Sequence, residues 1–393
     1  MTDTAKVHGL NNDWIEPDWP FLTLEELAEL LRRFPDAEGA ERILSFSPRP
    51  FSAASVVSTP HGNVFVKRHH ESVRNEEELN EEHNLLRYVR EHSSLVPRVL
   101  AHEHGETIIR RNQWIYEVHD VAAGLDLYEH DLSWTPFRNV AHARAAGRAL
   151  AQLHLATAGY QASPRKTRTL VGSFSIFAAN DPWSMLERYV EQRPALADYL
   201  IKRDWRAQVE ATLLPYYSRL HPQIESLNPL WTHNDFHASN LFWSSDSDGA
   251  SVRSIIDFGL ADRTNAIHDL AIAIERNGIR WLALDGSFAE VVHLDQILAL
   301  LNGYVEIRPL SISEVRALPA ILPLVHAEFA LSETDYYLRV LKSDQRAPFA
   351  WDGYFLGHAA WFGSDNGRRL LDQLSAWADS ITTPERQVED VHP

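Results

Sequence analysis

The sequence predicts an α+β protein with a strand-rich N-terminal part, one long helix beside its sheet, and a larger, mainly helical C-terminal part. Short apolar runs bounded by turn residues fall between residues 43 and 121, interrupted by one helical segment, and such runs are typical of strands. From residue 143 onward, apolar residues recur mostly with helical spacing. With 393 residues, the chain is long enough for two core-bearing units.

The composition is that of a globular protein, with 45% hydrophobic and 23% charged residues. A net charge of −17 argues against non-specific nucleic-acid binding, which needs a basic surface. The chain has no cysteine, which excludes disulfides and thiol catalysis. Residues 1–14 lack the apolar core of a signal peptide, and no run approaches the length of a membrane span. We therefore expect a cytosolic protein that binds neither nucleic acid nor membrane, and the sequence leaves its oligomeric state open.

The N-terminal part is expected to hold a five-stranded antiparallel sheet. Residues 1–20 are interpreted as a loose arm, and residues 23–34 as an amphipathic helix in which Thr23 and Glu26 have capping-box spacing. The predicted strands cover residues 43–47, 52–58, 63–69, 95–103 and 112–121.

A long acidic helix is predicted over residues 75–92. Most of its glutamates are expected to be solvated, but Glu82 lies three residues after Leu79 and four before Leu86, so it shares their apolar face. A carboxylate that points toward a core needs a partner. Glu82 is therefore the glutamate of this helix that we single out, with Glu78, one turn earlier, as the alternative.

The C-terminal part is predicted to be helical, starting with residues 143–156. His154, near the end of that helix, is interpreted as a packed core histidine. Residues 158–182 form a long segment rich in Gly, Ser and Pro, which could be a lid or a solvated surface excursion. The remaining expectations are two helices in residues 183–225, amphipathic helices in residues 294–380 and a disordered tail at residues 384–393.

The most informative stretch, residues 233–262, predicts a β-hairpin. Two short apolar runs, residues 241–243 and 252–256, are joined by Ser, Asp and Gly, which favour turns. We expect Leu241 to lie opposite Ile256.

This register would place Asn240 opposite Asp257, and cross-strand partners lie about 5 Å apart. Asp235 lies five residues before Asn240, in the loop that leads into the first strand. Three oxygen-bearing side chains would then converge. Oxygen ligands of this kind suit Mg²⁺, and the remaining carboxylate, Asp235, would be free to take a proton.

These residues also resemble a known family. HNDFHASN, residues 233–240, is similar to the HGDxHxxN signature of aminoglycoside phosphotransferase-like kinases, and IIDFGLAD, residues 255–262, to their DFG segment. The family's glycine is Asn234 here, a departure at a loop position. The resemblance implies a two-lobed protein-kinase-like fold, with an N-lobe at residues 1–118 and a C-lobe at residues 119–383.

The resemblance implies ATP and Mg²⁺ as cofactors and assigns the main catalytic roles. Asp235 would orient or accept the proton of the substrate hydroxyl, and Asn240 and Asp257 would hold the metal. Lys67, at the end of a predicted strand, would contact the α- and β-phosphates and be held by an ion pair with Glu82.

Weaker assignments concern the nucleotide. The first turn of the sheet would cover the phosphates, where Ser52 and Ser55 could offer hydroxyls in place of glycine, although an ordinary hairpin loop is an equal alternative. Adenine would bond main-chain groups near Glu117 to His119. Supporting roles follow for His233 and His237, which would steady the catalytic loop, and for Asp269, which would cap a helix and orient that loop.

The implied function is O-phosphorylation of a small-molecule acceptor by ATP, with GTP not excluded. An amine on the acceptor is expected because the chain is acidic and its C-terminal helices carry scattered acids. Amino sugars, aminoglycosides, amino alcohols and homoserine-like amino acids are all open. The candidate amine contacts, each of which could instead be a plain surface acid, are Glu328, Glu333, Asp335 and Asp352.

Three other functions are weighed against this one. A Ser/Thr protein kinase would share the fold, but the HxDxH pattern and the short segment after DFG argue against it. A pseudokinase would bind nucleotide without catalysis, and the intact catalytic set argues against that. A metallohydrolase would use His233, Asp235 and His237 as ligands for a transition metal.

Overall fold

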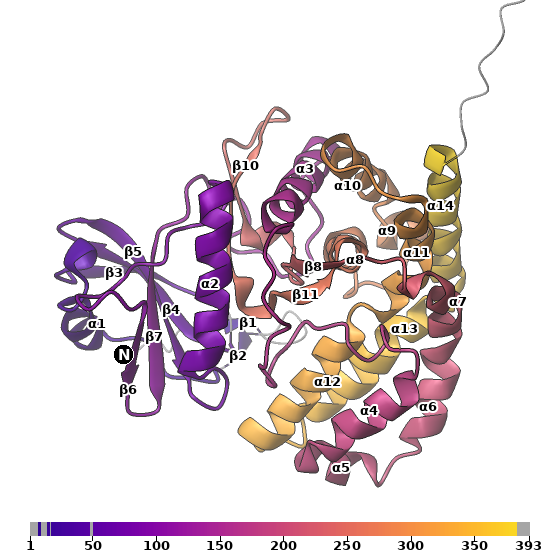
Figure 1. Ribbon diagram of the computed structural model, residues 1–393, viewed down its shortest axis with the longest axis horizontal. Coiled ribbons are helices and arrows are strands. Elements are labelled where there is room, and N and C mark those ends of the chain that lie inside the picture. Colours follow the sequence, from indigo (N-terminus) through magenta and orange to yellow (C-terminus); the bar gives the residue numbers. More distant parts are fainter. Residues whose placement is uncertain (1–6, 9–13, 16, 48–49, 383–393) are drawn as a thin grey trace, which may run out of the picture.

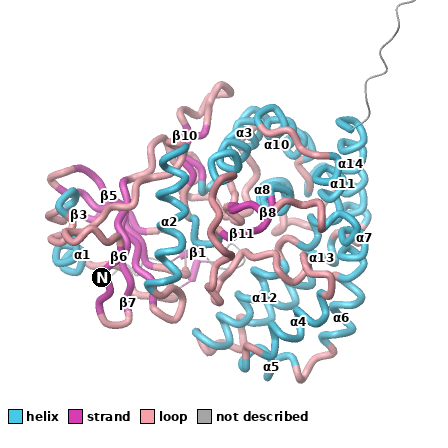
Figure 2. The backbone as a smooth tube through the Cα atoms, in the orientation of Figure 1, coloured by secondary structure: helices cyan, strands magenta, loops and turns pink. Residues whose placement is uncertain are grey.

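The computed structural model describes residues 7–8, 14–15, 17–47 and 50–382, and it has two lobes (Figure 1). Strands gather in the N-lobe, whereas helices make up most of the C-lobe (Figure 2). The α+β class and the two-lobed arrangement are thus confirmed. The expected boundary after residue 118 falls within the last strand of the sheet, and the tail at residues 384–393 lies outside the described residues.

The N-lobe sheet is antiparallel and has the strand order β3–β4–β5–β7–β6. Lys67 of the central strand lies between Ala54 and Glu117 of the neighbouring strands. The strands are β3 (Arg42–Phe46), β4 (Ala53–Thr59), β5 (Gly62–His70), β6 (Ile108–Arg111) and β7 (Trp114–Asp120).

The two faces of this sheet differ in chemistry because successive side chains of a strand point to opposite faces. Val66 and Val118 belong to an apolar core that includes Leu27 and Leu30 of helix α1. Their chain neighbours Lys67 and Glu117, like His69 and His119, therefore point to the other face. That face meets helix α2 and the interior of the molecule, so the strand period alone delivers the polar groups to the site.

One predicted strand is wrong as a regular strand. Residues 95–103 contain an isolated bridge between Val99 and His119, and the amide of Leu100 donates to the carbonyl of Val118 at 2.8 Å. The fifth strand is β6 instead, which pairs with the first half of β7 from Trp114 to Glu117. The two segments share one edge of β7, so the expected region reaches the sheet but does not form its strand.

Two helices flank the sheet, and both start where their capping residues predict. Helix α1 (Leu24–Leu31) begins after Thr23, whose side chain accepts a hydrogen bond within a complete capping box. Helix α2 (Glu76–His92) begins after Asn75, with Glu78 as the reciprocal partner of its capping box. Because the Glu78 carboxylate caps the helix, it does not serve as the alternative partner of the strand lysine.

Residues 17–20 of the N-terminal arm are not loose. Trp19 stacks on His70 of the sheet with ring centroids 4.5 Å apart. The neighbouring Asp18 reaches the C-lobe, where it accepts a hydrogen bond from Tyr336 at 2.9 Å and pairs with Arg346 at 2.5 Å. This segment therefore contacts both lobes. Earlier in the arm, β1 (Val7–His8) pairs with β2 (Trp14–Ile15).

The predicted hairpin is present, with a register that differs by one residue. Strands β9 (Leu241–Trp243) and β10 (Val252–Ile255) pair antiparallel, but Leu241 lies opposite Ile255 rather than Ile256, and an irregularity follows Val252. The amide of Ile256 donates to the carbonyl of Asn240 at 3.0 Å. A single-residue bulge of this kind leaves no clear signal in the apolar pattern.

The C-lobe helices are more numerous than expected, since residues 183–225 hold four rather than two. Helix α8 (Ala266–Gly278) is buried along its length and lies at the centre of the lobe. The others are α3 (Val140–Thr157), α4 (Pro182–Glu191), α5 (Pro194–Leu200), α6 (Trp205–Thr212), α7 (Leu214–Ile224), α9 (Phe288–Val291), α10 (Leu294–Ile307), α11 (Ile312–Ile321), α12 (Ala327–Asp335), α13 (Gly357–Trp361) and α14 (Asp365–Thr382), with π-helical turns at Tyr336–Val340 and Phe349–Leu356.

Glycines allow helices α3 and α10 to cross closely. A Cβ atom on Gly147 would lie 2.0 Å from the carbonyl oxygen of Leu300, and one on Gly303 would lie 2.1 Å from that of Arg144. Any larger residue at either position would force the helices apart. This contact fixes the position of His154, which is buried on α3 as predicted.

One helical stretch, residues 312–340, is long and apolar enough to span a membrane by length and composition. In the structure, 78% of its apolar window is buried inside the protein. It therefore has the surroundings of a core helix.

Candidate active site

A cavity of about 390 Å³ lies between the lobes and contains most of the predicted site residues. The N-lobe contributes Lys67, Glu82 and Glu117, and the C-lobe contributes Asp235 and Asp257. Ser52, Ser55, His119, His237 and Asn240 also line it. His233 and Asp269 lie behind this wall and are fully buried.

The carboxylate of Asp235 lines the cavity, where it can accept a hydrogen bond. Its Oδ1 lies 3.1 Å from Nη2 of Arg276 but has no hydrogen-bond partner of good geometry among the described residues. Its Oδ2 lies 3.5 Å from Nε2 of His237. Burial raises the pKa of Asp235, but the effects of His237 and Arg276 outweigh it and hold the pKa well below its usual range.

The catalytic loop is held in place by Asp269. Its carboxylate accepts hydrogen bonds from the amides of His233 and Asn234, both at 2.8 Å, and from Nε2 of His154 at 2.9 Å. The residue that caps α8 is Asn265, so the predicted capping role of Asp269 is wrong. The predicted contact with the catalytic loop is present.

Asn234 stands where the resembling family has glycine, and its backbone explains why the exchange is tolerated. Its φ is 60°, a left-handed conformation that asparagine adopts more readily than most other non-glycine residues. Its side-chain oxygen accepts hydrogen bonds from Thr232 at 2.8 Å and Thr264 at 3.2 Å. The departure therefore adds loop contacts and leaves the reacting group where it was.

Asn240 and Asp257 have the chemistry of magnesium ligands. The Asn240 amide donates to the carbonyl of Asp235 at 3.0 Å, which leaves its side-chain oxygen available. Asp257 is held in a left-handed conformation with φ 61°, the kind of backbone strain that occurs at functional sites. Its Oδ1 lies 3.0 Å from Nζ of Lys67. One carboxylate and one amide oxygen on the same cavity wall fit Mg²⁺.

The ion pair expected between Lys67 and Glu82 is not formed, because each has another partner. Lys67 pairs with Asp257, and Glu82 lies 3.6 Å from Nη2 of Arg165. Burial lowers the pKa of Lys67, but the fields of Asp257, Glu117 and Glu82 outweigh it and raise the pKa above its usual range. Glu82 is buried on α2, as the helical spacing predicted.

Arg165 belongs to the segment at residues 158–182, which packs against the site. Besides Glu82, its guanidinium contacts the carbonyls of Gly259 at 3.0 Å and Glu78 at 2.8 Å. It therefore links helix α2 to the DFG segment. Neither a lid nor a solvated excursion describes this part of the segment.

Comparison with known families decides the assignment of this site. The sequence profile of the phosphotransferase enzyme family matches residues 46–309, more than half of the chain and parts of both lobes. The chain belongs to the phosphotransferase enzyme family. The resemblance seen at residues 233–262 is thereby confirmed at the level of the family.

Curated relatives of this phosphotransferase include homoserine kinases. The homoserine kinase of Azorhizobium caulinodans is 28% identical over 201 residues, which cover 49% of this chain and 52% of that protein. The homoserine kinase of Caulobacter vibrioides is 32% identical over 182 residues, which cover 46% of this chain and 49% of that protein. The chain spans about half the length of the curated relatives it matches.

Solved structures share the fold along most of the chain. A microcompartment-associated aminopropanol kinase has a TM-score of 0.56 at 17% identity, covering 88% of this chain and 100% of that one. An amicoumacin kinase in complex with AMP-PNP and Ca²⁺ has a TM-score of 0.54 at 14% identity, covering 92% and 96%. An aminoglycoside phosphotransferase from Alicyclobacillus acidocaldarius has a TM-score of 0.52 at 17% identity, covering 92% and 98%.

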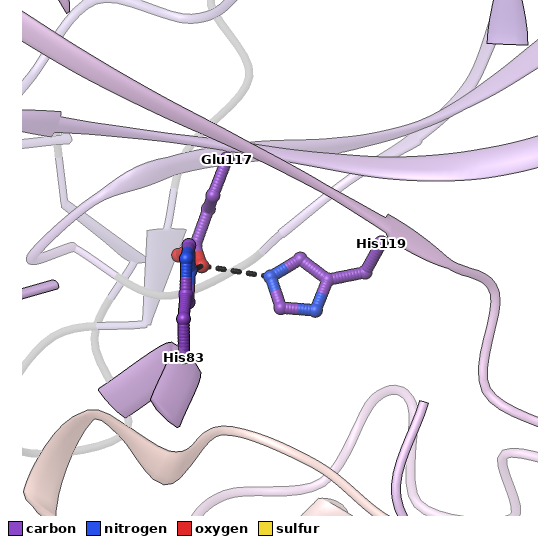
Figure 3. Close-up of side chains that lie close together, drawn as sticks. All are labelled: His83, Glu117 and His119. Atoms are coloured by element: carbon purple, nitrogen blue, oxygen red, sulfur yellow. Dashed lines mark hydrogen bonds and ion pairs between the residues drawn. The ribbon is translucent and has the colours of Figure 1, made fainter. Parts of the chain in front are cut away.

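A histidine cluster surrounds Glu117, and Figure 3 shows two of its members, His83 and His119. The Glu117 carboxylate contacts Nε2 of His69 at 2.9 Å, of His83 at 2.8 Å and of His119 at 2.7 Å. Burial raises the pKa of Glu117, but the histidines outweigh it and hold the pKa well below the usual range. The residues were expected near adenine through their main chain, whereas their side chains form a network of their own.

The main chain of Glu117 to His119 is also unavailable to adenine. Strand β5 pairs with it on one edge, and β6 with the segment at residues 98–100 occupies the other. The hinge therefore lies after β7, where Val121 and Ala122 line the cavity. Gly124, at φ 117° and in close contact with the backbone of Trp243, turns the chain into the C-lobe.

The phosphate-loop assignment stays a prediction. Ser52 and Ser55 both line the cavity, and the buried Oγ of Ser55 has no hydrogen-bond partner among the described residues. Part of the turn, residues 48–49, lies outside the described residues.

Of the four acids proposed to meet an acceptor amine, Glu333 lines the cavity and the other three do not. Glu328 accepts hydrogen bonds from Ser173, Ser175 and the amide of Ile176. Asp335 pairs with Arg339 at 3.2 Å, and Asp352 pairs with Arg203 at 2.7 Å. None of these three acids belongs to the pocket: Glu328 and Asp335 are buried structural acids, and Asp352 is a surface acid, the alternative that the sequence left open.

Sequence reasoning missed Arg276, which lines the acceptor end of the cavity. Its guanidinium lies 3.1 Å from Asp235, and its central carbon lies 5.3 Å from the ring centroid of Trp134 and 5.8 Å from that of Phe329. The signal was the polar triplet 275–277 at the end of an otherwise apolar helix. Asn277, in the same triplet, bonds the amide of Ala238 and so also supports the catalytic loop.

The metallohydrolase alternative does not fit the geometry. Nε2 of His233 contacts the carbonyl of Ile256 at 2.9 Å, and its Nδ1 accepts a hydrogen bond from the amide of Asp235 at 3.1 Å. Nδ1 of His237 contacts Ser239 at 2.9 Å. Both nitrogens of His233 are therefore occupied by the backbone, and the ring positions the loop.

Proposed function

We propose that this phosphotransferase transfers the γ-phosphoryl group of ATP to the hydroxyl of a small amine-bearing compound, and that a homoserine-like hydroxy amino acid is the preferred acceptor. The observation that best supports this proposal is the set of side chains beside Asp235 in the cavity. These are a carboxyl group, Glu333, and a guanidinium group, Arg276. A hydroxy amino acid carries the two complementary charges. The names of the curated relatives and of the aminopropanol kinase support a small amino alcohol or amino acid.

In this proposal, Asp235 orients the acceptor. Its Oδ1 accepts a hydrogen bond from the acceptor hydroxyl and takes the proton as the new O–P bond forms. The low pKa of Asp235 keeps the carboxylate ionised and makes it a weak base. Asp235 therefore acts mainly by aligning the acceptor hydroxyl, and it receives the proton late in the reaction. Arg276 holds the carboxylate in place and offers its remaining N–H groups to the carboxylate of the acceptor.

The nucleotide is proposed to lie between the sheet and the hairpin. Lys67 would leave its ion pair with Asp257 and bind the α- and β-phosphates instead. Asp257 would then be free to act with Asn240 as a metal ligand. Asn240 and Asp257 would hold Mg²⁺, which would supply positive charge against the phosphates. The main chain near Val121 would receive adenine. We place the enzyme in the cytosol as part of the same proposal.

The test measures acceptor-dependent ADP release by the full chain with Mg·ATP. The panel contains L-homoserine, 1-amino-2-propanol, an aminoglycoside and a neutral sugar, with Asp235→Asn as the inactive control. We expect the highest kcat/KM for L-homoserine or a close hydroxy amino acid. A neutral sugar as the best acceptor would refute the acceptor class, and no acceptor-dependent turnover with any small hydroxyl compound would refute the function.

A further inference from the structure

Three helices bring together metal-ligand side chains that the proposed reaction does not use. Glu275 comes from α8, His326 precedes the first turn of α12, and His358 comes from α13. Their exposed fractions are 1%, 3% and 6%. One ligand atom from each lies within 4.8 Å of the others. The cluster sits behind the acceptor end of the cavity, because the ring of Tyr354 in the cavity wall lies 5.3 Å from that of His358.

Five polar atoms of this cluster lack a partner with good hydrogen-bond geometry among the described residues, although one close contact joins Glu275 and His358. Nδ1 of His358 lies 2.9 Å from Oε1 of Glu275, and Nδ1 of His326 lies 3.9 Å from Oε2. Among the described residues, neither oxygen of Glu275, neither ring nitrogen of His326 and not Nδ1 of His358 has a partner with hydrogen-bond geometry. Buried polar groups are almost always paired, so three unpaired groups facing one another indicate a missing partner.

The other histidine cluster provides the contrast. Around Glu117, three imidazole nitrogens lie 2.7 to 2.9 Å from the carboxylate with hydrogen-bond geometry. Those three contacts satisfy the hydrogen-bonding capacity of the Glu117 carboxylate. At Glu275 the same types of side chain meet without satisfying one another.

Arg276 is a cation close to this cluster, but Asp235 shares it. Nε of Arg276 lies 3.7 Å from Oε2 of Glu275, but its guanidinium also pairs with Asp235.

The ligands are also held in position. The ring of His358 stacks on Trp281 with centroids 3.7 Å apart, and the indole N–H of Trp281 donates to the backbone carbonyl of Glu275 at 2.9 Å. The two contacts to Glu275 measure 2.9 and 3.9 Å. Neighbouring ligand atoms of a tetrahedral Zn²⁺ site are about 3.3 Å apart, given bonds of about 2.0 Å. The two contacts to Glu275 involve different carboxylate oxygens and lie on either side of this spacing, so the three side chains would have to adjust to complete the ligand positions.

We propose that Glu275, His326 and His358 bind one divalent transition metal, of which Zn²⁺ is the class that two imidazoles and a carboxylate favour. The ion joins α8, α12 and α13 and so fixes the helices that build the acceptor end of the cavity. Water would fill the fourth position. The site is separate from the magnesium ligands and does not depend on which acceptor is phosphorylated.

The experiment measures metal by elemental analysis in the full chain after dialysis against chelator and reloading with Zn²⁺. We expect one Zn²⁺ per chain, a higher Tm with Zn²⁺, and retention of the metal in Asp257→Asn, which lacks the proposed magnesium ligand. His326→Gln and His358→Gln should weaken Zn²⁺ binding at least about tenfold. The exposed His104→Gln is the matched control and should bind like the parent chain.

Two further arms keep the result decisive. Replacement of Zn²⁺ by Co²⁺ in the parent chain should give the absorption of a four-coordinate nitrogen and oxygen site, which needs no variant to fold. His83→Gln tests the other cluster. Loss of Zn²⁺ in that variant alone would overturn the assignment. A chain that binds no Zn²⁺ and whose Tm ignores both Zn²⁺ and chelator would show a metal-free Glu275–His358 pair and would also overturn it.

Discussion

Asp235 shows how far a single residue can be understood from its surroundings. The sequence placed Asp235 five residues before Asn240. The structure adds why it could bind the hydroxyl of an acceptor substrate: one carboxylate oxygen is buried beside Arg276 without a hydrogen bond. Its low pKa means that the group is a weak base which must be aligned with the hydroxyl.

Asp235→Asn should therefore lower kcat by about 10²–10⁴, the usual range for loss of a general base. The amide keeps the shape of the side chain, so the Kd of the nucleotide, measured by calorimetry without acceptor, should barely change. Equal losses in kcat and nucleotide affinity would show that Asp235 is a metal ligand or a structural residue.

Glu333 gives a pH dependence with a definite sign. Burial raises the pKa of Glu333 to about 7, more than its hydrogen bond with Tyr337 and the field of Arg276 lower it. The carboxyl is therefore neutral below about pH 7 and ionised above it. Because the ionised form attracts an ammonium group, the KM for an amine-bearing acceptor should fall as the pH rises from about 6 to about 8.

The check compares pH profiles of KM for the parent chain and for Glu333→Gln, with a neutral-acceptor profile as the reference. The Gln variant should have a high KM without that pH dependence. An unchanged profile in Glu333→Gln would assign the titration to another group.

At the scale of elements, the sequence predicted what local pattern controls. The strand period placed Lys67 and Glu117 on one face, and the helical period buried Glu82. The partners of these groups could not be predicted in the same way. Arg165 reaches Glu82 from a segment without periodicity, so the expected Lys67–Glu82 pair gave way to two others.

Arg165→Ala should destabilise the whole phosphotransferase. It leaves Glu82 without its ion-pair partner and removes the hydrogen bonds from the guanidinium to the carbonyls of Gly259 and Ala261. Removing one member of a buried ion pair costs about 3–5 kcal/mol in the free energy of unfolding, measured with urea. Lys166→Ala is the matched control, because this neighbour is exposed and pairs with Glu77 at the surface. A similar loss in both variants would disprove the linking role of Arg165.

At the scale of the molecule, the cavity joins segments that are distant in the sequence. The arm at residues 17–20 meets the sheet through Trp19 and the C-lobe through Asp18, although its composition suggested a loose end. Arg276 of α8 and Glu333 of α12 line the cavity together with Asp235, and the guanidinium of Arg276 lies over Phe329 of α12. No short-range pattern encodes such packing. The motif residues were therefore predictable, whereas of the two proposed acceptor contacts Glu333 was one of four candidate acids and Arg276 was missed.

The net charge of −17 acts on the acceptor at the same scale. An acidic surface attracts a cationic acceptor and repels an anionic one at low ionic strength, and salt screens this effect over about 10 Å at 0.1 M. L-homoserine carries no net charge, whereas its N-acetylated form is an anion that the surface repels. An amine-bearing acceptor should therefore have a higher kcat/KM than its N-acetylated analogue, and the advantage should shrink with added salt.

The two sources of this preference separate in Glu333→Gln. That variant removes one charge inside the cavity and leaves most of the surface field, so the amine preference at high salt should vanish while part of the salt dependence persists. The measurement is kcat/KM for L-homoserine and N-acetyl-L-homoserine at low and high ionic strength. Equal values for both compounds in the parent chain, with no salt dependence, would mean that the acids serve solubility and that the acceptor is neutral.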